Sequence, residues 1–178
     1  MVRRRSCAVS NHENTYHAIL REAAKTPLLR MRERAETNII REGGCLCGAV
    51  RFKAKGEPIN VRICHCRNCQ KAMGSPFNAR ALFWQSDLVV EGDTARYPSS
   101  EALDRVFCKT CGTRLFAWRK DPAVAGVSLA TFDDRHAFAP TEHIWVTEKM
   151  NWVRIEDGLP QHPHAAPQLL ASPVRTGN

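Results

Sequence analysis

Seven of the eight cysteines in this chain fall into three short clusters, and this grouping constrains the fold more than any other feature. In chain order the clusters are Cys45 with Cys47, then Cys64 with Cys66 and Cys69, then Cys108 with Cys111. Four thiolates complete the tetrahedral shell of a structural zinc, whereas three leave one position open to water or substrate. Seven thiols therefore predict one closed site and one open site.

The cellular compartment decides between metal ligands and disulfides. The chain starts with three arginines within its first five residues and no apolar segment follows them, so we expect no secretory signal and a cytoplasmic location. In a reducing cytosol, clustered cysteines are typical of metal sites. A disulfide framework also fits poorly with a cluster of three. No apolar run is long enough to cross a membrane, so no membrane partner is expected.

The positive charge of the chain belongs mainly to its N-terminal part. The formal net charge is +8, and residues 1–41 hold nine Lys/Arg against four Glu. Residues 42–163 hold sixteen Lys/Arg against fourteen Asp/Glu. Seven ionised thiols on two zinc ions would bring that part close to neutral. A phosphate-tracking surface on the core is therefore not indicated, and we expect no nucleic-acid partner for it.

The sequence divides into three parts. We expect residues 1–38 to form a basic extension, partly helical or disordered, residues 39–162 to form the zinc-binding domain, and residues 163–178 to be a disordered tail. Within the domain we expect one helical turn over 68–73 and no longer helix, so the fold class is mainly β. Alternating or apolar runs predict short strands over 49–55, 59–64, 77–84, 88–90, 105–107, 114–118, 124–131, 144–146 and 152–155.

The first and last cysteine pairs are predicted to share one ion. Cys108 and Cys111 have the two-residue spacing that lets the backbone turn both thiolates toward a metal, and a glycine follows them. Cys45 and Cys47 are closer together, but glycines on both sides permit a similar turn. We assign these four to a structural zinc. The alternative is that they are small buried hydrophobic side chains.

The middle cluster offers three ligands, Cys64, Cys66 and Cys69. Strand alternation places the first two on one face and His65 on the other, so we expect His65 to support the site or pack beside it. The fourth position has two interpretations, an exchangeable water or substrate thiol, or a remote side chain such as His143. A third interpretation is that no metal is bound at rest and the thiols act directly. His143 is also a candidate proton shuttle.

An open site of this kind indicates a particular chemistry. Zinc with thiolate ligands can bind an incoming thiol, lower its pKa and present a thiolate nucleophile at neutral pH. Such a soft nucleophile would attack an electrophilic carbonyl such as the carbon of an aldehyde. The spacing of the cysteines alone does not identify the thiol or the aldehyde.

Three stretches of the sequence together resemble one known family. They are GGCLCGAVRF at 43–52, CHCRNCQK at 64–71 with GSPF at 74–77, and FCKTCGT at 107–113. The likeness continues to DGLP at 157–160 and covers about residues 39–162. These residues resemble the glutathione-dependent formaldehyde-activating enzyme family, which also includes centromere protein V.

The resemblance implies a fold, a metal content and a reaction. The implied fold is compact and made of several short, coiled antiparallel β-sheets. The implied metals are a structural zinc on Cys45, Cys47, Cys108 and Cys111 and a second, catalytic zinc on Cys64, Cys66 and Cys69. The implied reaction is that of a carbon–sulfur lyase run toward synthesis, which joins glutathione to formaldehyde as S-hydroxymethylglutathione. The expected partners are thus a small-molecule thiol, with glutathione as co-substrate, and a small aldehyde.

Residues near the middle cluster are candidates for holding the thiol. Lys71 and Ser75 are expected to bind its carboxylates, with Arg67 as a further charge partner. The alternative is that these are solvated surface side chains. Trp145 and Trp152 are expected to lie in the core rather than in a pocket wall.

A second hypothesis from another class is a non-catalytic zinc-binding module for a protein or nucleic-acid partner. The basic extension from Arg3 to Arg41 favours it, and so does the resemblance to centromere protein V. A weaker third hypothesis, a metal-ribbon chaperone for a small GTPase, rests on fold-level analogy alone.

Overall fold

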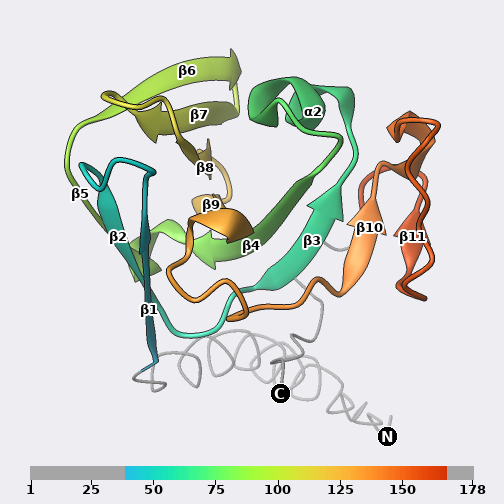
Figure 1. The fold of residues 1–178 in the computed structure, drawn as a ribbon, viewed down its shortest axis with the longest axis horizontal. Helices are drawn as coiled ribbons and strands as arrows, with labels where there is room; N and C mark the ends of the chain where they lie inside the picture. Colours follow the sequence, from blue (N-terminus) through green and yellow to red (C-terminus); the bar gives the residue numbers. More distant parts are fainter. Residues whose placement is uncertain (1–38, 168–178) are drawn as a thin grey trace, which may run out of the picture. The chain divides into compact units, whose positions relative to one another are not determined.

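The computed structural model describes residues 39–167, which form eleven strands, one α-helix and three short 3-10 helices (Figure 1). The mainly β class is therefore confirmed. The extension 1–38 and residues 168–178 of the predicted tail lie outside the described residues. The elements are β1 (Ile40–Gly44), β2 (Arg51–Lys55), β3 (Asn60–Cys64), α2 (Arg67–Met73), β4 (Asn78–Trp84), η2 (Gln85–Asp87), β5 (Leu88–Glu91), β6 (Thr94–Ser100), β7 (Leu103–Cys108), β8 (Arg114–Arg119), β9 (Val124–Ser128), η3 (Leu129–Thr131), β10 (Glu142–Ile144), η4 (Val146–Glu148) and β11 (Gln161–His162).

The strands form two sheets. The larger sheet has the order β11-β10-β3-β4-β9-β8-β7-β6, and the smaller one the order β1-β2-β5. Neighbours are antiparallel except β10, which pairs parallel with both β3 and β11. The helix α2 connects the neighbouring strands β3 and β4 and lies beside β6 and β7 (Figure 1). It has seven residues, and no helix within residues 39–167 is long and apolar enough to span a bilayer.

A cluster of phenylalanines joins the two sheets. Phe52 of β2 meets the ring of Phe116 of β8 edge to face, with 5.3 Å between the ring centroids, and meets Phe132 at 5.2 Å. Phe138 contacts Phe132 and Phe83 in the same edge-to-face manner. All five rings are buried. Edge-to-face contacts add to the stabilisation from apolar burial, so this cluster fixes the smaller sheet against the larger one.

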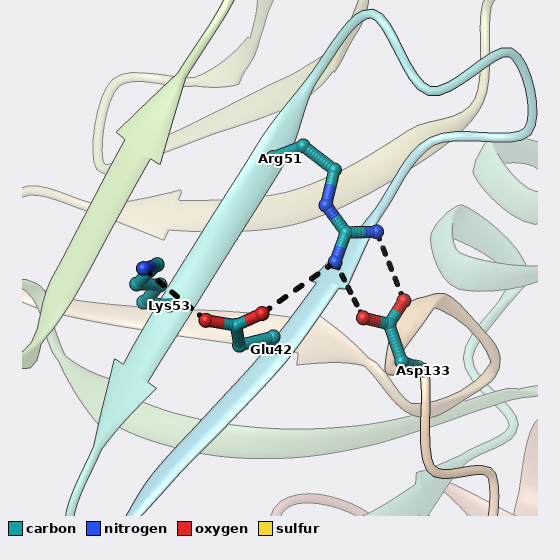
Figure 2. A network of polar contacts seen from close by, with 4 residues as sticks. All are labelled: Glu42, Arg51, Lys53 and Asp133. Carbon is teal, nitrogen blue, oxygen red and sulfur yellow. Dashed lines mark hydrogen bonds and ion pairs between the residues drawn. The ribbon is translucent and has the colours of Figure 1, made fainter.

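An exposed ion-pair network ties strands β1 and β2 of the smaller sheet to the loop after η3 (Figure 2). Both terminal nitrogens of Arg51 donate to the carboxylate of Asp133, one of them at 2.9 Å. The carboxylate of Glu42, on β1, lies 4.0 Å from Nη2 of Arg51 and 3.2 Å from Nζ of Lys53. The pair lowers the pKa of Asp133, because its Arg51 partner stabilises the carboxylate. These side chains are about half exposed, so the network orients the loop more than it stabilises the fold.

The structure confirms most of the predicted strands and corrects three. The strand predicted over 124–131 ends at Ser128, before η3, and of the segment 144–146 only Ile144 lies in a strand, β10. The segment 152–155 is not a strand: Trp152 is 68% exposed and a turn hydrogen bond joins Val153 to Met150. The place beside β10 is instead taken by β11. Three strands were not predicted, namely β1, β6 and β11. Of these, β6 is an edge strand with mostly exposed, polar side chains, so it carries no alternation of apolar residues.

Phe52→Ala should lower the free energy of unfolding by about 3–5 kcal/mol, because it leaves a cavity between the two sheets. Asp133→Asn should cost less than about 1 kcal/mol, because its ion pair is solvent-exposed. Urea unfolding of the zinc-loaded protein measures both variants. Equal losses would contradict the role given to the aromatic cluster.

Candidate metal centres and the adjoining cavity

Cys45, Cys47, Cys108 and Cys111, here the four-thiol group, converge from two sheets. Cys45 follows β1, whereas Cys108 is the last residue of β7. Their Sγ atoms all lie within 4.8 Å of one another, with 3.5 Å between Cys45 and Cys47 and 3.9 Å between Cys47 and Cys108. A tetrahedral zinc with Zn–S bonds of about 2.3 Å requires sulfurs about 3.8 Å apart. The donor set and its spacing therefore fit a closed zinc site, and all four cysteines are free of disulfides.

Backbone and hydroxyl groups point at these sulfurs. The N–H of Val50 donates to Sγ of Cys45 at 3.2 Å, and the N–H of Cys111 lies 3.5 Å from Sγ of Cys108. A hydrogen bond with the Thr113 hydroxyl lowers the pKa of Cys111 to about 5. Such bonds favour the thiolate, which is the form that binds metal. The glycines after both pairs, Gly48 and Gly112, have φ of 77° and 73°, as the predicted tight turns require.

Cys64, Cys66 and Cys69, here the three-thiol group, lie at the junction of β3 and α2. Cys64 ends β3, Cys66 is the N-cap of α2, and Cys69 lies in its first turn. The cap is made by the thiol itself, since the N–H of Cys69 donates to Sγ of Cys66 at 3.4 Å. The three Sγ atoms lie within 4.8 Å of one another, and within residues 39–167 no His, Asp, Glu or further Cys completes the group. This donor set fits a zinc that keeps one position open.

A cavity of about 370 Å³, here the first cavity, lies against the three-thiol group. Leu82, Ile144 and Trp145 supply apolar wall, and Asn68 and Asn78 supply amides. Four arginines also line it, Arg67, Arg80, Arg105 and Arg119, against one carboxylate, Glu148. The open side of the three-thiol group therefore faces a cationic, partly apolar space large enough for a small molecule.

The arginines act on the thiols. Hydrogen bonds from the thiols of Cys64 and Cys66 lower the pKa of Cys69, and the charges of Arg105 and Arg80 lower it further. The pKa of Cys64 is raised, because its neighbouring sulfurs compete for the same proton. Burial lowers the pKa of Arg80 itself. Within the described part of the chain, Nη1 of Arg80 has no hydrogen-bond partner. The arrangement favours a thiolate at Cys69, and this Nη1 of Arg80 can donate a hydrogen bond to an anion.

Comparison with known proteins identifies the family of this chain. The model of the glutathione-dependent formaldehyde-activating enzyme family matches residues 40–148, which include all seven clustered cysteines. The chain belongs to this family. The family resemblance inferred from the three cysteine clusters is therefore confirmed.

Two curated proteins and one solved structure are among those similar to this chain. A protein of Halomonas elongata, provisionally named a glutathione-dependent formaldehyde-activating enzyme, is 33% identical over an alignment of 128 residues that covers 65% of this chain and 80% of that protein. An uncharacterized lyase of Schizosaccharomyces pombe is 37% identical over 75 residues, 42% of this chain, and the match spans only 55% of the yeast protein. A crystal structure of a Rhodobacter sphaeroides protein is 25% identical with a TM-score of 0.44, covering 68% of this chain and 98% of that one.

Two buried histidines, His65 and His143, lie next to the three-thiol group of this family member and form a hydrogen-bonded series with Asp157. Nε2 of His65 lies 2.9 Å from Nδ1 of His143, and Nε2 of His143 lies 2.8 Å from the carboxylate of Asp157. The bond with His143 lowers the pKa of Asp157, and burial lowers the pKa of His65. Neither histidine joins the sulfurs, in line with the strand alternation that placed His65 on the other face. The interpretation of His143 as the fourth ligand therefore gains no support.

The predicted thiol-binding residues lie in different places. Arg67 lines the first cavity and also donates to the side chain of Gln70 at 3.3 Å. Lys71, on α2, lines a second, neighbouring cavity, and Ser75 lines neither cavity. The expectation that both tryptophans lie in the core is wrong. Trp145 lines the first cavity because its backbone, with φ of 61°, turns the chain at the end of β10, and Trp152 is exposed.

Sequence reasoning missed the other arginines of the first cavity. Arg80 lies on β4, whereas Arg105 and Arg119 lie on the consecutive strands β7 and β8, further along the chain. Arg80 stands between two alanines, Arg105 is followed by a valine and a phenylalanine, and Arg119 follows an alanine and a tryptophan. A cation in an apolar strand was the available signal, because a buried arginine needs an anionic partner. The convergence of the three strands could not be read from the sequence.

Cys66→Ser should reduce bound zinc from two equivalents to one with little change in circular dichroism, since the three-thiol group loses a ligand outside the main core. Cys108→Ser should instead abolish cooperative unfolding, because the four-thiol group joins two sheets. Metal analysis of the purified proteins and thermal denaturation measure both effects. One equivalent in the parent, or two retained in Cys66→Ser, would contradict the division.

Proposed function

We propose that this protein is a zinc-dependent, carbon–sulfur lyase-type enzyme that joins a thiol to a small aldehyde as an S-hydroxyalkyl adduct. The observation that carries the proposal is the three-thiol group facing the first cavity with no fourth protein donor within residues 39–167. Glutathione and formaldehyde, the pair in the family's name, are the first reactants to test. The name of the Halomonas relative and the lyase name of the yeast relative support the same reaction class. A cytoplasmic location would keep all seven thiols reduced.

Zinc on the three-thiol group would supply a position where an incoming thiol is held as a thiolate at neutral pH. The arginines of the first cavity then hold the carboxylates of that thiol and fix its sulfur beside the aldehyde. The sulfur attacks the carbonyl carbon and a C–S bond forms. The π electrons of the C=O bond move to oxygen, which takes up the proton given up by the thiol, so no oxidant or reductant is needed.

Two residues of the wall would assist this step. Trp145 covers apolar surface beside Cys64 and Cys66 and limits the water around the reacting atoms. Asn78 is 2% exposed, and its Oδ1 has no hydrogen-bond partner within the described residues. That oxygen would accept a hydrogen bond from the hydroxyl group of the adduct. Ser75 is given no part, because it lines neither cavity.

The proposal is tested by following formaldehyde–glutathione exchange by NMR with the zinc-loaded protein. The parent should accelerate adduct formation over buffer, and Cys66→Ser should lose at least about tenfold of this rate because the reactive site is incomplete. An exchange rate equal to that of buffer, in protein with two zinc equivalents, would remove the glutathione–formaldehyde assignment.

Arg80→Gln should lower kcat/KM for glutathione by about 10- to 100-fold, since one charged hydrogen bond contributes about 1.5–3 kcal/mol. Arg135→Gln is the matched control, because Arg135 is exposed and lines neither cavity. Steady-state kinetics measure both variants. Equal effects of the two substitutions would show that net charge alone, and not a contact in the cavity, assists the thiol.

The alternative hypothesis, a non-catalytic zinc module, depends on the basic extension. Residues 1–38 lie outside the described residues, so the fold adds nothing in its favour. Deleting them separates the two hypotheses: unchanged adduct formation supports the enzyme.

A further inference from the structure

A second cavity of about 420 Å³ adjoins the first. It lies between α2 and the strands β6, β7 and β8, where Figure 1 shows the helix beside the strand pair. Lys71 and Asn68 come from the helix, Tyr97 and Ser99 from β6. The two cavities share Asn68 and Arg105, so one extended molecule can occupy both.

The walls of the two cavities are strongly cationic. Six basic side chains line them, against the single carboxylate of Glu148 and the three thiols of the three-thiol group. Even with all three thiols ionised and no metal to offset them, the lining keeps a positive balance. The basic residues are Arg67, Lys71, Arg80, Arg105, Arg114 and Arg119.

Arg114 of β8 is the clearest case in the second cavity. It is 9% exposed, and within residues 39–167 its Nε and Nη2 have no hydrogen-bond partner. Nη1 meets only the thioether of Met73, a weak acceptor. Burial and the nearby charge of Arg105 lower the pKa of Arg114 to about 10, so it remains protonated at neutral pH.

Arg62 shows how another buried arginine of this domain is balanced by an acidic residue. Arg62 of β3 is 2% exposed and forms an ion pair with Glu142 of the neighbouring strand β10. Neither Arg105 nor Arg114 forms an ion pair with any acidic residue of the described part. Nε of Arg105 donates to the hydroxyl of Ser99 at 3.2 Å, whereas the guanidinium of Arg114 has only the thioether of Met73 as a hydrogen-bond partner within the described residues. A buried guanidinium such as that of Arg114 is costly without an anionic partner, which points to a partner that comes from outside the chain.

We propose that the second cavity is a carboxylate subsite, in which Arg105, Arg114 and Lys71 hold a carboxylate of a reactant whose reacting atom lies at the three-thiol group. The reactant is then an acidic molecule with a carboxylate remote from its thiol or aldehyde. This inference rests on the proposed function for the role of the first cavity. The carboxylate comes either from the thiol or from the aldehyde, and steady-state kinetics with acidic and neutral reactants distinguish the two sources.

Direct binding of succinate tests the subsite without any reaction. Calorimetry with the zinc-loaded full chain should show succinate binding, at least tenfold weaker in Arg114→Gln and in Lys71→Gln and unchanged in Arg135→Gln. Lys71 is exposed on α2, so Lys71→Gln keeps the test valid if Arg114→Gln does not fold. No succinate binding to the parent, or equal binding by folded parent and Lys71→Gln proteins, would overturn the proposal.

Kinetics identify the source of the carboxylate. In the first pair of reactions the aldehyde is formaldehyde, and the acidic thiol 3-mercaptopropionate is compared with the neutral thiol 2-mercaptoethanol. In the second pair the thiol is 2-mercaptoethanol, and the acidic aldehyde succinic semialdehyde is compared with the neutral aldehyde butanal. The Lys71→Gln substitution should raise KM at least fivefold for the acidic member of one pair and leave the neutral member unchanged. A rise shared by acidic and neutral members would overturn the subsite. Succinate binding without any adduct formation would support the subsite and contradict the proposed function instead.

Discussion

The convergence of four sulfurs between two sheets is the contact on which the rest of the fold depends. The turn after β1 belongs to the smaller sheet and the end of β7 to the larger one, and the four-thiol group joins them within 4.8 Å. Four thiolates at this spacing repel one another unless a cation lies between them, so the free energy of metal binding becomes free energy of folding. The phenylalanine cluster fixes the same two sheets at a second place. With both in position, β7 and β8 carry Arg105 and Arg114 to the cavities.

The wall opposite those arginines is held by polar contacts. Arg62 of β3 pairs with Glu142 of β10, and Glu142 also accepts from His162 of β11 at 2.7 Å. His65, directly after β3, also forms a hydrogen bond with His143 of β10. Within residues 39–167, Trp145 is the one non-glycine residue with positive φ. Strain of this kind persists only where the surrounding contacts determine the backbone, and here it follows directly on the strand that these polar groups hold.

The sequence predicted the chemistry of individual residues better than it predicted which distant residues lie close together in the fold. Cysteine spacing and the following glycines indicated both thiol groups, because the ligands of each cluster are local in the chain and the turn geometry is set by a few residues. The pairing of the first and last clusters was inferred by counting, and it agrees with the structure. The cationic cavities were not foreseen, since Arg80 of β4 meets Arg105 and Arg119 of β7 and β8 only through the order of strands in the larger sheet, β4-β9-β8-β7. The edge strand β6 and the short β11 lacked apolar alternation, and segment 152–155 showed alternation but had no neighbouring strand available.

Local charge and total charge lead to different conclusions for this domain. Residues 42–163 are almost balanced, which argued against a polyanion-binding surface. The balance arises because several carboxylates lie on the outside, such as Glu42 and Asp133 beside Arg51, whereas cations line the two cavities. In a partly desolvated space each guanidinium acts more strongly than at the surface, because water screens it less. A near-neutral domain can therefore present a strongly positive site, and an acidic small molecule, unlike nucleic acid, is small enough to reach it.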